Sequence, residues 1–242
     1  MEALSLALQT EALRKVLHSI RAGERGVVIF DLDGTLFDNR PRTLAILNQA
    51  ADGWAARDPE AARAVRSLRF TELGYLASET LEQVGVDRTL IEEAVQLWRE
   101  RFFTDDILSH DVPLAGAVSF AKACYEAGAN LAYLTGRDLP NMALGTFRSL
   151  RDAGFPIGLP GTELVLKPDF ETPDLTFKRD ITPEITRLGR VAATFDNEPG
   201  NCNAFAEMFP EGHHFMMLTQ YAPNPPPLKD GVAVIQDFRM ES

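Results

Sequence analysis

Hydrophobic residues follow two different periods along the chain, and their alternation predicts the fold. Short apolar runs, too brief for helices, begin at residues 27–30 and are typical of fully buried strands in a parallel sheet. From residue 111 onward, such runs alternate with segments in which apolar residues recur at helical spacing. This alternation indicates an α/β fold, a Rossmann-like, doubly wound parallel sheet with helices on both faces. The predicted strands cover residues 129–134, 164–166, 191–195, 214–218 and 232–235, and the predicted helices cover 114–128, 140–154, 178–188 and 199–209.

Residues 41–104 interrupt the alternation, because they show helical periodicity and none of the β-rich runs. One helix is predicted to start at a capping box that begins with Thr89. Another is indicated by the spacing of Leu73, Leu76, Thr80 and Val84. We therefore predict a small all-helical cap domain over residues 39–109, inserted into a core domain made of residues 1–38 and 110–242. The alternative is that these helices simply cover the sheet, although a crossover between parallel strands normally needs only one helix.

Charge and cysteine content narrow the class of protein. The 242 residues include 24 basic and 35 acidic side chains, a net charge of −11, which argues against binding to nucleic acid or to an anionic membrane. Cys124 and Cys202 have no metal-type spacing, and the N-terminus carries no basic region of the kind that opens a signal peptide. We expect a reduced, cytoplasmic chain whose partner is a small molecule, and its oligomeric state stays open.

Candidate chemistry begins where the first predicted strand ends, in Asp31-Leu32-Asp33-Gly34. Ligands of open α/β sheets bind beyond the carboxyl ends of the strands, so both carboxylates lie where a site is expected. Asp31 continues the strand and Asp33 lies in the turn, so the two can play different roles, one as nucleophile and metal ligand and one in proton transfer. The alternative is an ordinary turn, in which Asp and Gly are common.

Other strand ends add polar groups to the same edge of the sheet. Thr135 and Gly136 follow the strand 129–134 and could bind phosphoryl oxygens through a hydroxyl and a backbone N–H, unless Thr135 merely caps a helix. Asp196 follows the strand 191–195 and could share a metal with Asp31. A transferring phosphoryl group also needs a fixed cation, for which Lys167 and Lys178 are the candidates.

The run Val27-Val28-Ile29-Phe30-Asp31-Leu32-Asp33-Gly34-Thr35-Leu36 resembles the first motif of the haloacid dehalogenase (HAD) superfamily of aspartate-nucleophile phosphotransferases and hydrolases. Leu131-Ala132-Tyr133-Leu134-Thr135 resembles its second motif, and the position of Lys178 before the next strand resembles its third, which favours Lys178 over Lys167. Asp196 resembles the fourth motif, but Asn197 and Glu198 depart from it and their roles stay open.

The resemblance implies a mechanism. Asp31 would attack phosphorus, and Asp33 would protonate the leaving oxygen and then activate water. Thr135, Gly136 and Lys178 would hold the phosphoryl oxygens. Mg²⁺ would bind Asp31, the backbone carbonyl of Asp33, and Asp196. Because Asp33 is present and displacement of a halide needs no such acid, we predict a Mg²⁺-dependent phosphatase acting on a small phosphorylated metabolite. A phosphomutase or other phosphotransferase, and a catalytically silent HAD-like binding protein, are the alternatives.

Overall fold

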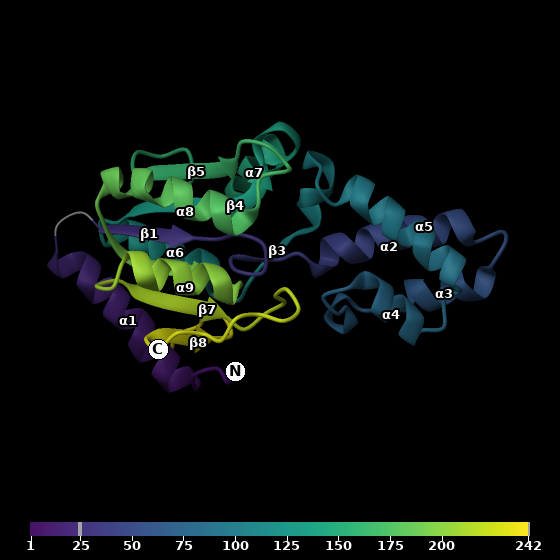
Figure 1. Cartoon of the computed structure of the whole chain (residues 1–242), viewed down its shortest axis with the longest axis horizontal. Coiled ribbons are helices and arrows are strands. Elements are labelled where there is room, and N and C mark those ends of the chain that lie inside the picture. Colours follow the sequence, from purple (N-terminus) through teal and green to yellow (C-terminus); the bar gives the residue numbers. More distant parts are fainter. Residues whose placement is uncertain (24–25, 242) are drawn as a thin grey trace.

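A six-stranded parallel sheet forms the centre of the protein (Figure 1), whose computed structural model describes residues 1–23 and 26–241. The strand order is β5-β4-β1-β6-β7-β8, so the first strand lies in the middle and its neighbours come from distant parts of the sequence. The predicted α/β parallel sheet is therefore confirmed. The strands are β1 (Gly26–Phe30), β4 (Asn130–Asp138), β5 (Thr162–Lys167), β6 (Arg190–Asp196), β7 (His213–Met217) and β8 (Val232–Ile235).

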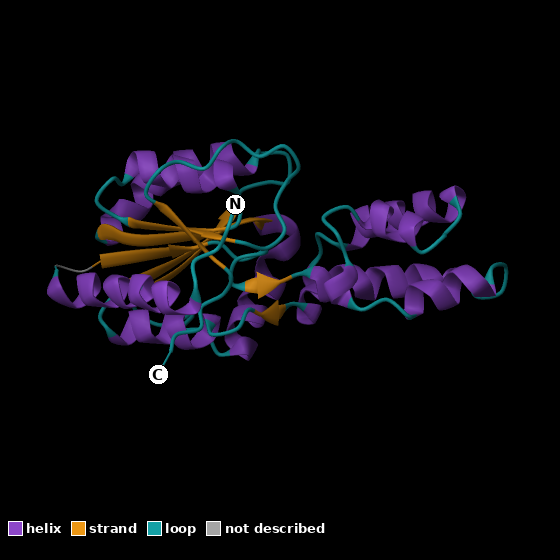
Figure 2. Cartoon of the chain, turned by 90° about the horizontal axis from the view of Figure 1, so that it is seen from below, coloured by secondary structure: helices purple, strands orange, loops and turns teal. Residues whose placement is uncertain are grey.

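Helices cover both faces of the sheet (Figure 2), because every side chain of the buried strand β1 needs an apolar partner. Val28 and Phe30 pack in one apolar cluster with residues of α1 (Leu6–Ala22), α6 (Ala117–Glu126) and α7 (Leu139–Ala153). Val27 and Ile29 face the opposite way. They pack with residues of α8 (Asp174–Ile185), the short helix η3 (Thr186–Leu188) and α9 (Pro199–Met208).

The helices between residues 40 and 110 lie beyond one end of the sheet (Figure 1) and share an apolar core of their own. Trp54, Val65, Leu81 and Leu90 belong to this core, each at most 7% exposed. The cap domain over residues 39–109 stays a prediction, and the helices of this region end one residue beyond it. They are α2 (Arg40–Trp54), α3 (Pro59–Arg66), η1 (Phe70–Glu72), α4 (Ala77–Gln83), α5 (Arg88–Arg101) and η2 (Asp105–His110).

Two short strands join the cap to the sheet. β2 (Phe37–Asp38) and β3 (Val112–Pro113) pair antiparallel, with Phe37 opposite Pro113 and Asp38 opposite Val112. The chain therefore leaves the core and returns to it at a single point. In the part of the chain that the structure describes, no helix is both long and apolar enough to span a membrane.

Several element boundaries differ from the sequence prediction. The N-cap of α5 is Asp87, whose carboxylate accepts a hydrogen bond from the backbone N–H of Thr89 at 2.8 Å, so the capping box predicted at Thr89 is wrong. α4 begins at Ala77, which leaves Leu73 and Leu76 in the preceding loop. α8 begins at Asp174, so Lys178 lies one turn inside the helix instead of opening it. A polar cap sets the start of α5, whereas α4 and α8 begin after Leu76 and Pro173 without a side-chain cap, so apolar spacing alone does not define where these helices start.

Candidate functional site

Asp31, Lys178 and Asp196 meet at the carboxyl edge of the sheet. Asp31 directly follows β1 and Asp196 ends the neighbouring strand β6, so parallel pairing brings their carboxylates to the same edge. The Lys178 ammonium, supplied by α8, lies 2.9 Å from Asp31 Oδ1 and 2.8 Å from Asp196 Oδ2. All three side chains are buried. Charge-assisted hydrogen bonds at these distances fix the orientation of both carboxylates.

The sequence analysis missed two further side chains of this cluster, Asp174 and Asn201. Asp174 stands four residues before Lys178 on the same helix, and its Oδ2 lies 3.4 Å from the ammonium. Asn201, in the first turns of α9, donates to Asp174 Oδ2 at 3.0 Å and to Asp196 Oδ1 at 3.1 Å. The i, i+4 spacing of Asp174 and Lys178 was a usable signal, because such pairs are neighbours on a helix.

The cluster holds more negative than positive charge, since three carboxylates surround one ammonium. Burial raises the pKa of Asp31 to about 8, with Asp196 and Asp174 adding to the effect and Lys178 opposing it. Burial likewise raises the pKa of Asp196 despite the same lysine. Among the described residues, Asp174 Oδ1 is buried without a hydrogen-bond partner. Additional positive charge would stabilise this edge of the sheet.

Thr135 and Gly136 lie within β4, which continues past its predicted end with a shift of register between Leu134 and Asp138. Thr135 is fully buried, and its hydroxyl accepts a hydrogen bond from the backbone N–H of Arg137 at 3.2 Å. A Cβ atom at Gly136 would lie only 2.5 Å from Asp174 Oδ1, so a larger residue cannot occupy this position without displacing the carboxylate. The glycine therefore lets β4 and α8 approach each other beside the cluster.

Asp33 belongs to a second polar cluster, with two arginines and another aspartate. Arg137 donates to Asp33 from Nε at 2.8 Å and from Nη2 at 2.9 Å. Arg42, in the first turn of α2, also donates to Asp33. Asp111, just before β3, accepts from Arg42 Nε at 2.8 Å and from Arg137 Nη2 at 2.7 Å. The cluster thus joins the core residues Asp33 and Arg137 to residues at both ends of the cap.

This arrangement sets the charge of Asp33. Burial would raise the pKa of the Asp33 carboxyl, but the guanidinium groups of Arg137 and Arg42 outweigh it and hold that pKa well below its usual range. Arg42 and Arg137 are at most 2% exposed, so water screens these ion pairs little. The sequence analysis assigned no role to Arg137, and it missed Arg42 and Asp111 because their meeting depends on the pairing of β2 with β3. We call Asp33, Arg42, Asp111 and Arg137 the hinge cluster.

Asn197, Glu198 and Lys167, whose roles the sequence did not settle, form hydrogen bonds with loop backbone. Asn197 donates to the backbone carbonyl of Gln220 at 2.6 Å, and Glu198 accepts from the N–H of Ala222 at 3.0 Å, so both organise the loop after β7. Lys167 donates to the carbonyls of Phe170 and Thr172, at 3.1 and 2.8 Å, which orders the loop before α8. Lys178, and not Lys167, therefore lies against Asp31 in this structure.

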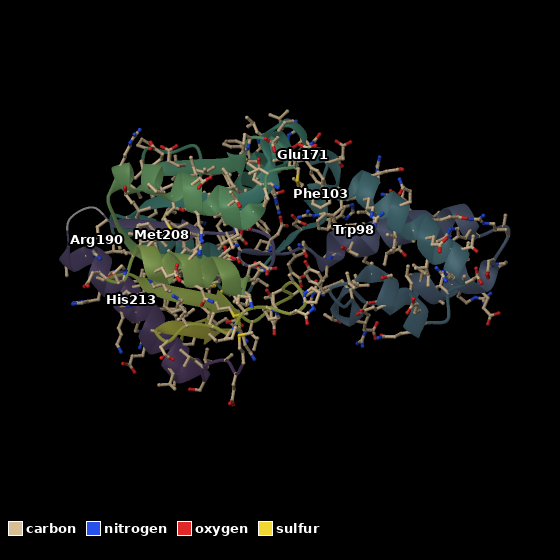
Figure 3. The ribbon with its side chains drawn as sticks, viewed as in Figure 1. Trp98, Phe103, Glu171, Arg190, Met208 and His213 are labelled. Carbon is tan, nitrogen blue, oxygen red and sulfur yellow. The ribbon has the colours of Figure 1, made fainter. Side chains whose placement is uncertain are left out.

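A cavity of about 480 Å³ opens between the sheet edge and the cap. Asp31, Thr135, Gly136 and Lys178 line its core side. The cap side carries side chains of α5, of the residues that directly follow it and of the loop before α4. Trp98 of α5 and Phe103 just after α5 lie near the junction of the two parts (Figure 3). The volume suits a small molecule.

Comparison with known protein families decides the class of this site. Residues 26–160, more than half of the chain, match the haloacid dehalogenase-like hydrolases. The chain belongs to this family. No curated protein sequence matches the chain, so membership rests on the family match and on the fold.

Solved structures share the fold of this HAD-like hydrolase at low sequence identity. A protein described as a candidate phosphatase from Clostridium difficile is 13% identical, with a TM-score of 0.55 over 89% of this chain and 95% of the other. Protein tyrosine kinase A from Mycobacterium tuberculosis is 20% identical, with a TM-score of 0.53 over 88% and 94%. A HAD-superfamily hydrolase of subfamily IA from Geobacter sulfurreducens is 16% identical, with a TM-score of 0.53 over 89% and 93%.

The carboxylate cluster of this HAD-like hydrolase fits a divalent cation. Its excess of negative charge and the unpartnered Asp174 Oδ1 both favour a bound cation. No group of three or more acidic, histidine or cysteine side chains among the described residues is already arranged to enclose a metal. Magnesium does not require one, because it usually binds through one or two carboxylates together with water and substrate phosphate.

Proposed function

We propose that this HAD-like hydrolase is a Mg²⁺-dependent phosphatase that hydrolyses a small phosphorylated metabolite through an aspartyl-phosphate on Asp31. The observation that carries the proposal is the position of the Asp31 carboxylate, which faces a cavity lined by Thr135, Gly136 and Lys178 and is hydrogen-bonded to Lys178 at 2.9 Å. This combination supplies a nucleophile and groups that bind phosphoryl oxygens at one strand end.

In the first step, an oxygen of Asp31 attacks phosphorus, and the bond from phosphorus to the leaving oxygen breaks. Lys178 orients the nucleophile and offers its positive charge to the phosphoryl oxygens, while Thr135 and the N–H of Gly136 could donate to them. The leaving oxygen takes a proton, which the resemblance assigns to Asp33 as donor. Water then attacks phosphorus, the bond to Asp31 breaks, and inorganic phosphate is released.

Asp33 is held in the ionised form that the second step uses. Its ion pairs with Arg137 and Arg42 favour the ionised carboxylate, which is the form that accepts a proton from the attacking water. The same pairs fix the carboxylate at the edge of the cavity, which Asp33 also lines. Donation in the first step requires Asp33 to take up a proton against these charges.

Asp31, Asp196 and the backbone carbonyl of Asp33 are the groups that would hold Mg²⁺. When bound, the ion would neutralise charge on the transferring phosphoryl group and on the carboxylate cluster. The cap residues that line the cavity exclude bulk water from the first step and restrict the size of the substrate.

Phosphate release from a panel of phosphorylated metabolites and p-nitrophenyl phosphate, with and without Mg²⁺, tests the proposal. We expect Mg²⁺-dependent release that the Asp31→Asn variant lacks. Transfer of phosphate between two compounds without net release would show a phosphomutase or phosphotransferase instead. Absence of both activities, with no binding of Mg²⁺ in a titration, would identify a silent binding protein.

A further inference from the structure

An aromatic cluster lines the cavity that Asp31 also lines. Trp98 and Phe102, one helical turn apart at the end of α5, stack with ring centroids 4.4 Å apart, and Phe103 packs edge-on against both. Phe170, from the loop that Lys167 orders, meets Phe103 at 5.0 Å and continues the cluster onto the core. Trp98, Phe102 and Phe103 all line the cavity.

The orientation of these rings is fixed before any substrate binds. The indole Nε1 of Trp98 donates to Thr43 Oγ1 at 3.1 Å. The Phe102 ring lies against Trp98 and also against the guanidinium of Arg42, whose central carbon is 4.3 Å from the ring centroid. Because Arg42 is itself held by Asp111, the aromatic wall is connected to the hinge cluster. A rigid aromatic surface loses little conformational entropy when it binds a ligand.

Some polar groups on this side of the cavity are already engaged within the protein, while Tyr75, Ser78 and Arg99 also line it. Arg40 is paired with Asp38, Thr43 accepts from Trp98, and Gln220 donates to the carbonyl of Leu73. The apolar side chains of Leu73, Leu76, Val95 and Met142 line the cavity beside the aromatic cluster. Where the leaving group meets the aromatic cluster and these apolar side chains, a polyol would lose hydrogen bonds to water without replacement, whereas an aromatic ring would not.

We infer that the leaving group of the substrate carries a planar aromatic ring close to the ester oxygen, and that this ring packs on Trp98 and Phe103. The inference rests on the proposed phosphatase function and names its substrate class, a phosphate monoester of an aromatic alcohol or phenol. Ring–ring contacts contribute about 0.5–1.5 kcal/mol beyond the area they bury, so each ring has a measurable effect on specificity.

The test compares three phosphate esters of primary alcohols, whose leaving oxygens all need to be protonated in the same way. Benzyl phosphate carries a planar ring, cyclohexylmethyl phosphate an apolar ring of similar size that is not planar, and glycerol 1-phosphate a polyol. We expect kcat/KM to fall in that order, by roughly tenfold or more between the first and the last. Equal values for the three esters, or a preference for glycerol 1-phosphate, would overturn the inference while leaving the phosphatase proposal intact.

Substitutions test whether Trp98 and Phe103 produce the preference for an aromatic leaving group. Trp98→Leu and Phe103→Leu keep an apolar side chain but remove the ring, and each should lower the ratio of kcat/KM for benzyl to glycerol phosphate about 3- to 10-fold. Phe70→Leu is the matched control, because Phe70 is a partly buried cap phenylalanine outside the lining of the cavity, and its ratio should not change. Unchanged ratios in both Trp98→Leu and Phe103→Leu would refute the assignment of the ring site.

A binding measurement separates failure of the inference from failure of the proposed function. Calorimetric titration of the Asp31→Asn protein with phenylphosphonate and methylphosphonate requires no turnover. Tighter binding of phenylphosphonate, lost in Trp98→Leu and Phe103→Leu, would support the ring site even if no ester were hydrolysed. Equal affinities would contradict it, whatever the hydrolysis assays show.

Discussion

Arg137 holds the carboxylate of Asp33 with two hydrogen bonds, from Nε at 2.8 Å and from Nη2 at 2.9 Å. The residue proposed for proton transfer is therefore a partly exposed member of an ion-pair cluster whose arginines are buried, as well as part of the proposed active site. Replacing it changes both chemistry and stability, and the two effects can be separated by measurement.

Asp33→Asn should lower kcat on ester substrates by roughly 10²–10⁴-fold, because the leaving oxygen loses its proton donor and the water loses its base. It should also reduce the free energy of unfolding in urea, since Arg42 and Arg137 lose a charged partner. Asp38→Asn is the control, because the Asp38 carboxylate pairs with Arg40 and does not itself line the cavity, and its kcat should stay near wild type. An unchanged rate in Asp33→Asn would exclude the proton-transfer role.

Asp31→Asn should abolish turnover by at least about 10³-fold, because the amide cannot form the covalent intermediate. Rapid-quench trapping of phosphorylated protein should detect the intermediate in wild type and not in the variant. Turnover close to wild type would contradict the role of Asp31 as nucleophile.

The raised pKa of Asp31 predicts how stability depends on pH. Folding raises this pKa from an ordinary value near 4 to about 8, so the folded protein binds the proton more tightly than the unfolded chain. The stabilisation is fully present below pH 4 and is lost as pH rises towards 8. Without Mg²⁺, the melting temperature of wild type should therefore fall more steeply between pH 5 and 8 than that of Asp31→Asn. Added Mg²⁺ should stabilise wild type more at pH 8 than at pH 6, because binding needs the carboxylate. Parallel curves for the two proteins would contradict this explanation.

Lys178→Met and Lys167→Met should affect different properties of the protein, the first its catalytic rate and the second chiefly the order of a loop. Removal of the Lys178 ammonium leaves three carboxylates without their cation, so we expect at least about a 10²-fold loss of kcat, from lost electrostatic stabilisation. Lys167→Met should chiefly loosen the loop that follows β5, with a smaller change in kcat. A larger loss of kcat in Lys167→Met would show that the phosphate lysine is Lys167.

The neighbouring residues Arg40 and Arg42 provide a test of the hinge cluster. Arg42 is fully buried between two carboxylates, and Arg42→Ala should reduce the free energy of unfolding by about 3–5 kcal/mol. Arg40 pairs with Asp38 at a partly exposed position, so Arg40→Ala should cost about 0–1 kcal/mol. Urea denaturation measures both. Equal losses would mean that burial does not distinguish the two pairs.

Local sequence patterns predicted much of the fold. Runs such as residues 27–30 and 191–195 proved to be buried parallel strands, because apolar runs of that length fit few other environments. The ends of helices were less predictable. At α5 the first turn is capped by Asp87 and not by Thr89. Both are polar residues near the start of the helix, and apolar periodicity does not distinguish between them.

The site residues likewise divide into those that the sequence predicted and those that it did not. Asp31, Thr135 and Asp196 follow from the rule that strand ends converge at one edge of the sheet. Arg42 and Asp111 do not, because 68 residues of cap separate them and only the pairing of β2 with β3 brings them together. Asn201 escaped notice for a similar reason, since its partners Asp174 and Asp196 come from other elements.

The pairing of β2 with β3 also makes the cap separable from the nucleophile and the phosphate-binding groups, while Arg42 and Asp111, which help to hold Asp33, belong to the exchanged segment. Phe37 and Pro113 are direct neighbours across the ribbon, so a tight turn in place of the residues between them would leave the path of the core chain unchanged. Asp31, Thr135, Lys178 and Asp196 all lie outside that segment. One catalytic scaffold of this kind can therefore acquire a new substrate preference by exchange of a contiguous stretch of gene, with the reacting groups left in place.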